Sequence, residues 1–426
     1  MSMQVCGTLI LQADADPDGN AGESAAAKMR KEEIMKNETK ERVQKLMEEA
    51  IAGGVIAGAS ILVRKDGEEL HYAEAGFADV EEKKPIRRDT IFRLYSMSKP
   101  VTAAAAMILM DQGKLDLAAQ VSEFLPGFAD VQVEKDGVTT ASRTPVTIKH
   151  LLNMTSGLTY GDEETACGRA TQALIEECTE KLSTKEELST CEIADRIGRV
   201  PLAFEPGTSW RYGLSADVLG AVIEKASGMP FGDFLKKYLF DPLDMKDTGF
   251  YVPEEKQGRL VTTYESLGDG TMIPYTGNHL GILYQMNRKP RFESGGAGLV
   301  STIDDYSRFA QMLLDEGVYH GVRILSKRCV KLLTGGGLTS EQQKQMDNWI
   351  GLEGYTYGNL MRVMERPGRA CMLVGEGEYG WDGWLGCYFA NLPRERVTLL
   401  LMMQKRDAGT ISMTRKIRNV VLAGIY

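Results

Sequence analysis

The stretch "FRLYSMSKPVTAAAAMILMDQGKL", Phe92–Leu115, turns from a polar segment into a long apolar run. The run Ala103–Met110 favours a helix. Because proline is tolerated only in the first turn of a helix, Pro100 requires this helix to begin within a few residues upstream. Ser96 is therefore predicted at or next to the first turn, where free N–H groups and the positive end of the helix dipole point. Lys99 follows three residues later, a spacing that brings side chains to one helix face.

A serine and a lysine at this spacing can form a minimal nucleophile and base. A serine hydroxyl is a poor nucleophile until a base removes its proton. A buried lysine can have its pKa lowered enough to act as that base. Ser96 and Lys99 form the only Ser-x-x-Lys match in the chain. Taken alone, this spacing favours a different interpretation, in which the serine caps the helix and the lysine lies on the surface.

The composition argues against several classes of protein. The chain has 426 residues and a formal net charge of −9, with 50 Lys and Arg against 59 Asp and Glu, and it lacks the basic stripe of a nucleic-acid-binding protein. The seven cysteines form no CxxC pair and the four histidines no metal-spaced pair, so no metal or other cofactor is predicted. The longest apolar stretches, Val101–Met110 and Val397–Met403, are too short to cross a bilayer. We expect a soluble cytoplasmic protein with no nucleic-acid or membrane partner.

Strand signals occur at both ends of the chain. Lys65-Asp66-Gly67 separates two strand-like runs, and Asp-Gly is a strong signal for a β-hairpin. The segment "WLGCYFANLPRERVTLLLMMQ" (384–404) predicts a second hairpin that turns at Asn391–Glu395. Helices are expected at 31–52 and 412–422. Strands so far apart in sequence imply one antiparallel sheet assembled from distant segments.

The middle of the chain, residues 98–240, is mainly helical in pattern. It contains a short hairpin signal at 131–140 and an acidic helical insertion at 162–198. The predicted fold class is therefore α+β, an antiparallel sheet flanked by helices with an all-helical subdomain. Residues 1–30 show no periodicity and are predicted to be a disordered or loosely packed leader. Residues 31–426 are predicted to form one domain, with its sheet region from 31–95 and 293–426 and pocket loops at 160–200 and 250–292.

Four segments in this order resemble the serine β-lactamase, DD-peptidase and esterase superfamily, most closely its class C β-lactamase-like branch. They are "FRLYSMSKPVTAAAAMILMDQGKLDL" (92–117), "TIKHLLNMTSGL" (147–158), "FEPGTSWRYGLSADVLGAVIEKASGMP" (204–230) and "ESGGAGLVSTIDDYSRFAQMLLDEG" (293–317). The resemblance covers roughly residues 40–425 and implies a five-stranded antiparallel sheet with flanking helices. It also implies that Ser96 is the nucleophile and Lys99 its base.

In this superfamily a tyrosine motif follows the Ser-x-x-Lys pair, and the matching residue here is Tyr212 in "WRYGLS". The resemblance implies that Tyr212 lies near Ser96 and Lys99 and relays protons to the leaving group. A phenol suits this task only where cationic neighbours favour the phenolate, and Lys99 could supply that charge. The alternative interpretation of Tyr212 is a half-buried core residue.

Two motifs depart from the β-lactamases and are more similar to the esterases and transesterases of the superfamily. The Tyr-x-Asn motif is replaced by Tyr212-Gly213-Leu214, and leucine cannot hydrogen-bond the amide of a β-lactam side chain. The Lys-Thr-Gly or His-x-Gly motif aligns with Trp381-Asp382-Gly383, which lacks a cation for a substrate carboxylate. Trp381, Asp382, Gly383 and Leu214 are therefore predicted to contact a neutral substrate. Arg211 or Arg362 could still enter the pocket and restore an anion site.

The resemblance also implies an oxyanion hole formed by the backbone N–H groups of Ser96 and Trp384. Gly383 would let this backbone approach the reacting carbonyl closely. The alternative interpretation of Trp381 and Trp384 is packing at a glycine-rich strand edge. No Gly-x-Ser-x-Gly elbow occurs, which argues against an α/β-hydrolase.

Together these features predict a serine hydrolase that cleaves or transfers acyl groups of small esters through a covalent acyl-enzyme, without a cofactor. One alternative is a class C-type β-lactamase or a D-Ala-D-Ala carboxypeptidase acting on a β-lactam-like or peptide substrate. Another is a non-catalytic binding or sensor protein on the same fold. The oligomeric state is left open by the sequence.

Overall fold

The main feature of the computed structural model, which describes residues 35–135 and 137–425, is an antiparallel sheet of eight strands. The predicted leader and the start of the helix expected at 31–52 lie outside the described residues. The strands, in sheet order, are β12 (Tyr355–Tyr357), β13 (Arg362–Met364), β14 (Tyr379–Asp382), β15 (Tyr388–Leu392), β16 (Val397–Met403), β1 (Gly58–Lys65), β2 (Glu68–Asp79) and β3 (Lys84–Pro85).

The expected count of five strands was wrong, because short strands extend both edges of the sheet. β12 and β13 have three residues each and β3 has two. Strands of this length carry no detectable alternation of apolar and polar residues. The α+β class itself is confirmed, with the sheet built from segments at both ends of the described chain.

Both predicted hairpins are present. In the β1–β2 turn, Asp66 has φ 51° and Gly67 has φ 82°, the left-handed backbone that a two-residue Asp-Gly turn requires. The second hairpin joins β15 to β16 through residues 393–396, so its turn begins slightly later than predicted. β1 also pairs with β16, which brings residues near the two ends of the chain into register, with Ala59 opposite Met403.

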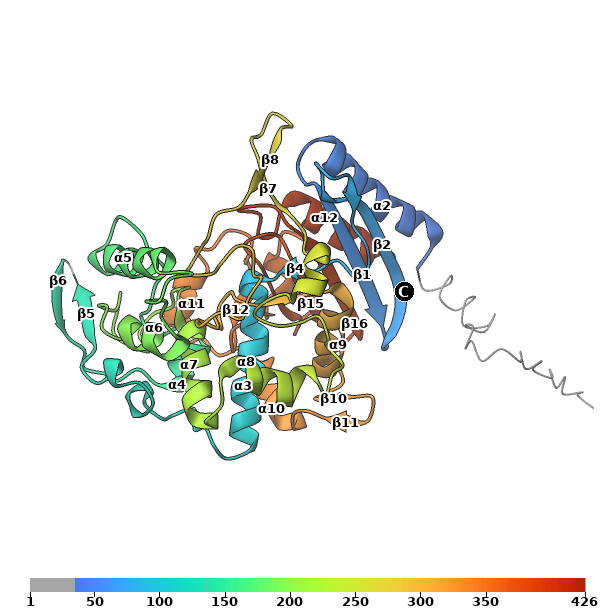
Figure 1. The fold of residues 1–426 in the computed structure, drawn as a ribbon. Coiled ribbons are helices and arrows are strands. Elements are labelled where there is room, and N and C mark those ends of the chain that lie inside the picture. The colour runs from blue at the N-terminus through green and yellow to red at the C-terminus, as the bar shows by residue number, and fades with distance from the viewer. Residues whose placement is uncertain (1–34, 136, 426) are drawn as a thin grey trace, which may run out of the picture.

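Helices cover both faces of the sheet because the apolar side chains of its central strands alternate between two clusters. Ile61 and Val63 pack with Met47 of α2 (Asn37–Ala52) and Ile417 of α12 (Ser412–Ala423). Leu62 points to the opposite face and joins the large cluster around the central helices. α2 and α12 lie together on the outer face of the sheet (Figure 1).

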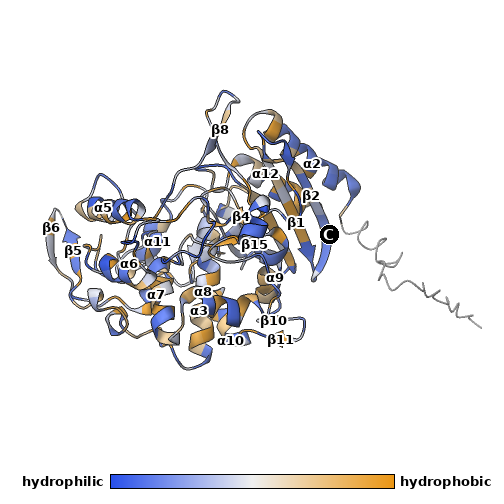
Figure 2. Cartoon of the chain, viewed as in Figure 1, coloured by the Kyte–Doolittle hydropathy of each residue, from blue (hydrophilic) through white to orange (hydrophobic). Residues whose placement is uncertain are grey.

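α3 (Ser98–Asp111) runs through the middle of the molecule, between the sheet and a helical region (Figure 1). Every residue of α3 from Ser98 to Leu109 is buried, and Figure 2 shows it largely apolar where α2 is largely hydrophilic. Among the described residues, the remaining α-helices are α4 (Ile148–Leu152), α5 (Ala166–Glu180), α6 (Thr190–Ile197), α7 (Ser215–Ser227), α8 (Phe231–Leu235), α9 (Ile303–Leu314), α10 (Lys327–Leu333) and α11 (Ser340–Met346). The part of the chain that the structure describes also forms four two-stranded sheets: β4 (Phe92–Arg93) with β9 (Val300–Ser301), β5 (Gln132–Lys135) with β6 (Val138–Ala141), β7 (Thr263–Ser266) with β8 (Met272–Tyr275), and β10 (Val318–Tyr319) with β11 (Val322–Arg323).

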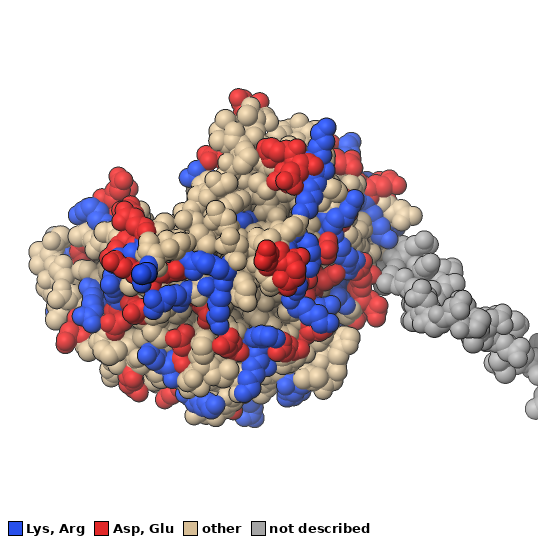
Figure 3. Space-filling view, viewed as in Figure 1, with Lys and Arg blue, Asp and Glu red and all other residues tan. Residues whose placement is uncertain are grey.

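The surface agrees with the charge pattern of the sequence. On the face drawn in Figure 3, acidic and basic side chains are interspersed rather than gathered into a basic stripe. No helix in the described part of the chain is long and apolar enough to span a membrane. The hairpin expected at 131–140 is β5–β6, and the helical insertion expected at 162–198 contains α5 and α6.

Candidate active site

Ser96 and Lys99 lie together where the central helix begins. Tyr95–Met97 form a single 3₁₀ turn, and α3 starts at Ser98 with Pro100 in its first turn, as predicted. The Lys99 Nζ donates hydrogen bonds to Ser96 Oγ at 3.1 Å and to the carbonyl oxygen of Gly296 at 2.9 Å. Ser96 is partly exposed while Lys99 is fully buried, so the hydroxyl faces a cavity and the amine lies beneath it.

Burial lowers the pKa of Lys99 to about 7, because a charged ammonium is poorly solvated there. The carboxylates of Asp217 and Asp382 act in the opposite direction and favour the ammonium. Asp217 is itself buried in α7 and accepts hydrogen bonds from Ser294 Oγ and from the backbone N–H of Gly296. Near neutral pH, a substantial fraction of Lys99 is therefore an unprotonated amine that can accept a proton from Ser96.

Tyr212 lies beside this pair and keeps its proton. Lys99 Nζ is 4.6 Å from the centre of the Tyr212 ring, and Trp381 Nε1 donates a hydrogen bond to Tyr212 Oη at 3.0 Å. Burial raises the pKa of Tyr212 well above its usual range, although polar contacts with Ser96 and Trp381 oppose this shift. The phenolate that the charge of Lys99 could have favoured is thus not stabilised, because burial of the Tyr212 phenol outweighs the influence of a lysine that is only partly charged near neutral pH.

A second phenol, Tyr160, completes the surroundings of Lys99 and was missed by sequence reasoning. Lys99 Nζ donates to Tyr160 Oη at 3.1 Å, and the Tyr160 and Tyr212 rings are 5.7 Å apart. Tyr160 follows the quoted segment 147–158 by two residues. Its position next to that segment was visible, but nothing in the sequence indicated that its side chain turns toward Lys99.

The end of β14 approaches the turn before Ser96 very closely, and a glycine makes this possible. A Cβ on Gly383 would stand 2.3 Å from the carbonyl oxygen of Leu94, a distance at which the two atoms would overlap. Only glycine, which has no Cβ, allows the two backbone segments to come this close. Trp384 follows directly and lines the same cavity as Ser96. The two residues predicted to supply oxyanion-hole N–H groups therefore line the same cavity.

Tyr95, immediately before Ser96, adopts a backbone conformation that is rare for a tyrosine. Its φ is +45°, in the left-handed region, and such strain is kept only where surrounding contacts hold it. The Tyr95 ring packs against Trp384 at 4.9 Å and His279 at 5.8 Å, and His279 stacks on Trp384 at 4.1 Å between ring centres. These contacts fix the orientation of the Ser96 turn, and no sequence signal marked His279 for this position.

The cavity at Ser96 has a volume of about 490 Å³, in the range of small-molecule sites. Of the predicted site residues, it is lined by Ser96, Tyr212, Trp381, Asp382, Gly383 and Trp384. Leu214 does not line it, which corrects its assignment as a substrate contact. Leu214 immediately precedes α7 and is buried in the core, where it borders a separate small internal cavity with Asp217.

The charged side chains of this cavity are acidic. Asp382 and Asp407 line it, and none of the lysines and arginines described by the structure does. Arg211 instead pairs with Asp162 at 2.8 Å. Arg362 is fully buried, with its Nη1 3.9 Å from Asp382 Oδ1. The two arginines that could have restored an anion site are therefore placed elsewhere.

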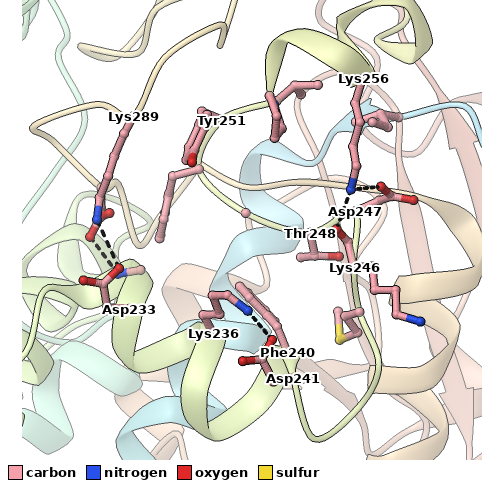
Figure 4. A pocket seen from close by; sticks show the side chains of 18 residues that line it. Asp233, Lys236, Phe240, Asp241, Lys246, Asp247, Thr248, Tyr251, Lys256 and Lys289 are labelled. Carbon is pink, nitrogen blue, oxygen red and sulfur yellow. Dashed lines mark hydrogen bonds and ion pairs between the residues drawn. The ribbon is translucent and has the colours of Figure 1, made fainter.

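A second cavity, of about 340 Å³, shares no residue with the first (Figure 4). Its four lysines all have carboxylate partners: Lys236 pairs with Asp241, Lys246 with Asp244, Lys256 with Asp247 and Lys289 with Asp233. No serine or cysteine is among its lining residues, so it lacks a nucleophile of the kind found at Ser96. Within the described residues, no group of three or more His, Cys, Asp or Glu side chains is arranged to hold a metal ion.

Comparison with known families agrees with this arrangement. The family model described as Beta-lactamase matches residues 43–422. The chain belongs to the beta-lactamase family. The serine and lysine motif, the tyrosine motif and the Trp381-Asp382-Gly383 strand all fall inside the matched residues.

Individual relatives within the beta-lactamase family extend over most of the chain. Esterase EstB of Burkholderia gladioli is 33% identical over 399 residues, which cover 90% of this chain and 95% of EstB. An uncharacterised protein of Mycobacterium tuberculosis is 32% identical over 377 residues, 85% of this chain and 89% of that protein. The solved structure of EstCE1, described as a hydrolase with promiscuous acyltransferase activity, is 28% identical and superposes with a TM-score of 0.76 over 90% of this chain and 98% of EstCE1.

Proposed function

We propose that this protein is a serine esterase that cleaves or transfers acyl groups of small esters through a covalent acyl-enzyme. The observation that carries the proposal is the buried Lys99 amine, 3.1 Å from Ser96 Oγ and with a pKa near 7. A base with a pKa close to the working pH transfers protons most effectively. A capping serine with a surface lysine would instead leave the amine in water.

In the first half of the reaction, Ser96 Oγ attacks the ester carbonyl and its proton passes to Lys99. The backbone N–H groups of Ser96 and Trp384 stabilise the oxyanion. Tyr212, which is protonated in the free enzyme, donates its phenolic proton to the departing alcohol, and the proton held by Lys99 then restores the phenol. In the second half, water or another alcohol attacks the acyl-enzyme, its proton returns through the same groups, and Ser96 is released.

The relatives support this chemistry. EstB is named an esterase, and EstCE1 is described as a hydrolase that also transfers acyl groups. Both cover about nine tenths of this chain, and the family match over residues 43–422 includes every residue that lines the cavity. We infer that hydrolysis and transfer compete at Ser96 here too, according to whether water or an alcohol reaches the acyl-enzyme. The cytoplasmic location stays a prediction from the sequence.

The charge of the cavity favours neutral esters over anionic β-lactams. A lost charge-assisted contact removes about 1.5–3 kcal/mol, and tenfold in kcat/KM is about 1.4 kcal/mol. With Asp382 and Asp407 in the wall, we expect p-nitrophenyl butyrate to be preferred over nitrocefin by roughly 10- to 10³-fold in kcat/KM.

The test is a panel of p-nitrophenyl esters, nitrocefin and a D-Ala-D-Ala peptide on one preparation, with Ser96→Ala as the blank. Faster turnover of nitrocefin would favour the β-lactamase alternative, and faster turnover of the peptide the carboxypeptidase alternative. No turnover of any substrate beyond the Ser96→Ala blank would favour the binding-protein alternative.

A further inference from the structure

The walls of the Ser96 cavity combine aromatic rings with carboxylates. Six aromatic side chains line it: Tyr95, Tyr160, Tyr212, Trp349, Trp381 and Trp384. The face of an aromatic ring is electron-rich and attracts a cation, most strongly for tryptophan and where water is excluded. A neutral acyl chain needs apolar walls, but it gains nothing from carboxylates placed among them.

The aromatic rings form two groups, and each group has its own carboxylate. In the first group, Trp349 meets Tyr212 at 5.0 Å and Trp381 at 6.4 Å between ring centres, and Asp382 directly follows Trp381 in sequence. In the second group, Trp384 packs against Tyr95, and its Nε1 donates a hydrogen bond to Asp407. An occupant of the cavity would therefore meet tryptophan rings from both groups, and each group has a carboxylate beside it.

The basic groups near these carboxylates lie outside the cavity or are largely neutral. Arg362 approaches Asp382 from within the core. Arg406 lies 3.3 Å from Asp407 but also pairs with Glu265 at 2.7 Å, and neither arginine lines the cavity. Burial lowers the pKa of the lining His279 to about 4 and that of Lys99 to about 7, so at pH 8 neither carries much positive charge.

We infer that the Ser96 cavity selects esters that carry a quaternary ammonium group within a few atoms of the scissile carbonyl. The inference rests on the proposed esterase function and adds the substrate class. A quaternary ammonium has no N–H donor and is satisfied by ring faces and a nearby carboxylate, which are the groups that this wall offers. A neutral ester of the same shape fills the same space without the electrostatic gain.

The experiment compares butyrylcholine with 3,3-dimethylbutyl butyrate, in which carbon replaces the charged nitrogen. Hydrolysis is followed by titration of released acid at pH 8. We expect kcat/KM to be about tenfold higher for the cationic ester at low salt, equal to about 1.4 kcal/mol, and the ratio to shrink in 0.5 M NaCl. Choline and 3,3-dimethylbutan-1-ol, tested as inhibitors of p-nitrophenyl acetate hydrolysis, give a second measure that does not require turnover of either ester.

Two variants test whether the preference for the cationic ester comes from the carboxylates and aromatic rings of the Ser96 cavity. Asp407→Asn keeps an oxygen for the Trp384 hydrogen bond but removes the charge, and Trp349→Leu keeps an apolar wall but removes a ring face. Each should lower the cationic-to-neutral ratio about threefold or more. Asp241→Asn, which removes one charge in the second cavity, is the matched control and should leave the ratio unchanged.

Equal kcat/KM for the two esters, or equal inhibition by the two alcohols, would overturn the inference while leaving the esterase proposal intact. A ratio that survives both Asp407→Asn and Trp349→Leu would also overturn it. Absence of any ester hydrolysis beyond the Ser96→Ala blank would instead overturn the proposed function.

Discussion

The two sides of the Ser96 cavity are built in different ways. The nucleophile side is local, because Ser96 and Lys99 are three residues apart at the start of one buried helix. The rest of the cavity lining comes from β14 and from loops far apart in sequence, which contribute Trp349, Trp384 and Asp407. The comparison teaches that the chemistry of the site depends on one short segment, whereas its selectivity depends on long-range packing.

The largest loss of activity is expected when Lys99, the base on the nucleophile side, is replaced. Lys99→Met keeps the apolar length of the side chain but removes the amine, and kcat/KM on p-nitrophenyl butyrate should fall about 10³-fold. In the wild type, kcat/KM should rise with pH through about 7, because Lys99 accepts the Ser96 proton only after losing its own.

The control for this variant is Lys149→Met, which alters another partly buried lysine that hydrogen-bonds Asn359. It should keep both the rate and the pH profile. A flat pH profile between 6 and 8 in the wild type would show that a different group takes the proton.

The second-largest effect on activity is expected from the close contact between Gly383 and the Leu94 carbonyl, which joins the two sides of the cavity. In Gly383→Ala, the added methyl group would overlap the Leu94 carbonyl and push the end of β14 away from the Ser96 turn. Loss of one oxyanion donor lowers kcat about 10²- to 10³-fold, and we expect that range with little change in KM. Gly258→Ala, where a Cβ meets nothing within 4 Å, is the control. If Gly383→Ala keeps the wild-type kcat, the backbone N–H of Trp384 is not part of the oxyanion hole.

The two phenols beside Lys99 allow the same chemical change at two positions. Tyr212→Phe should lower kcat about 10²-fold, because Tyr212 donates the proton to the departing alcohol. The loss should be smaller for esters with good leaving groups, such as p-nitrophenyl esters, than for alkyl esters. Equal losses for both kinds of ester would show that Tyr212 supports the fold of the pocket rather than the proton transfer.

Tyr160→Phe should have the smallest effect, less than about tenfold in kcat/KM, because it removes one hydrogen-bond acceptor from Lys99. That acceptor favours the ammonium form, so its loss should lower the pKa of Lys99 further. The midpoint of the pH profile should therefore move below that of the wild type. A shift to higher pH would show that Tyr160 donates to the neutral amine instead.

The sequence predicted the parts of the molecule that depend on local spacing. Pro100 located the helix start that presents Ser96, and Asp66-Gly67 located a hairpin of the sheet. Leu214 was misplaced because the start of α7 turns it into the core, away from Tyr212 two residues earlier. Such a reversal follows from the path of the backbone, which motif spacing does not encode.

Other features depended on contacts that no local pattern records. Tyr160, His279, Trp349 and Asp407 reach the cavity from four separate loops, and each approach is set by packing against distant residues. The short edge strands of the sheet were missed because two or three residues carry no periodic signal. The reaction type was therefore predictable from the sequence, while the aromatic and acidic walls required the structure.

The most direct test of the central claim is to identify the serine that a fluorophosphonate phosphonylates, with fluoride as the leaving group. The wild-type protein is labelled at pH 8, digested, and the modified peptide identified by mass spectrometry, with Ser98→Ala as a matched control for a neighbouring buried hydroxyl. We predict a single label on Ser96, retained in Ser98→Ala and lost in both Ser96→Ala and, under brief labelling, Lys99→Met. A label on any other serine, or ester hydrolysis that persists in Ser96→Ala, would contradict the account.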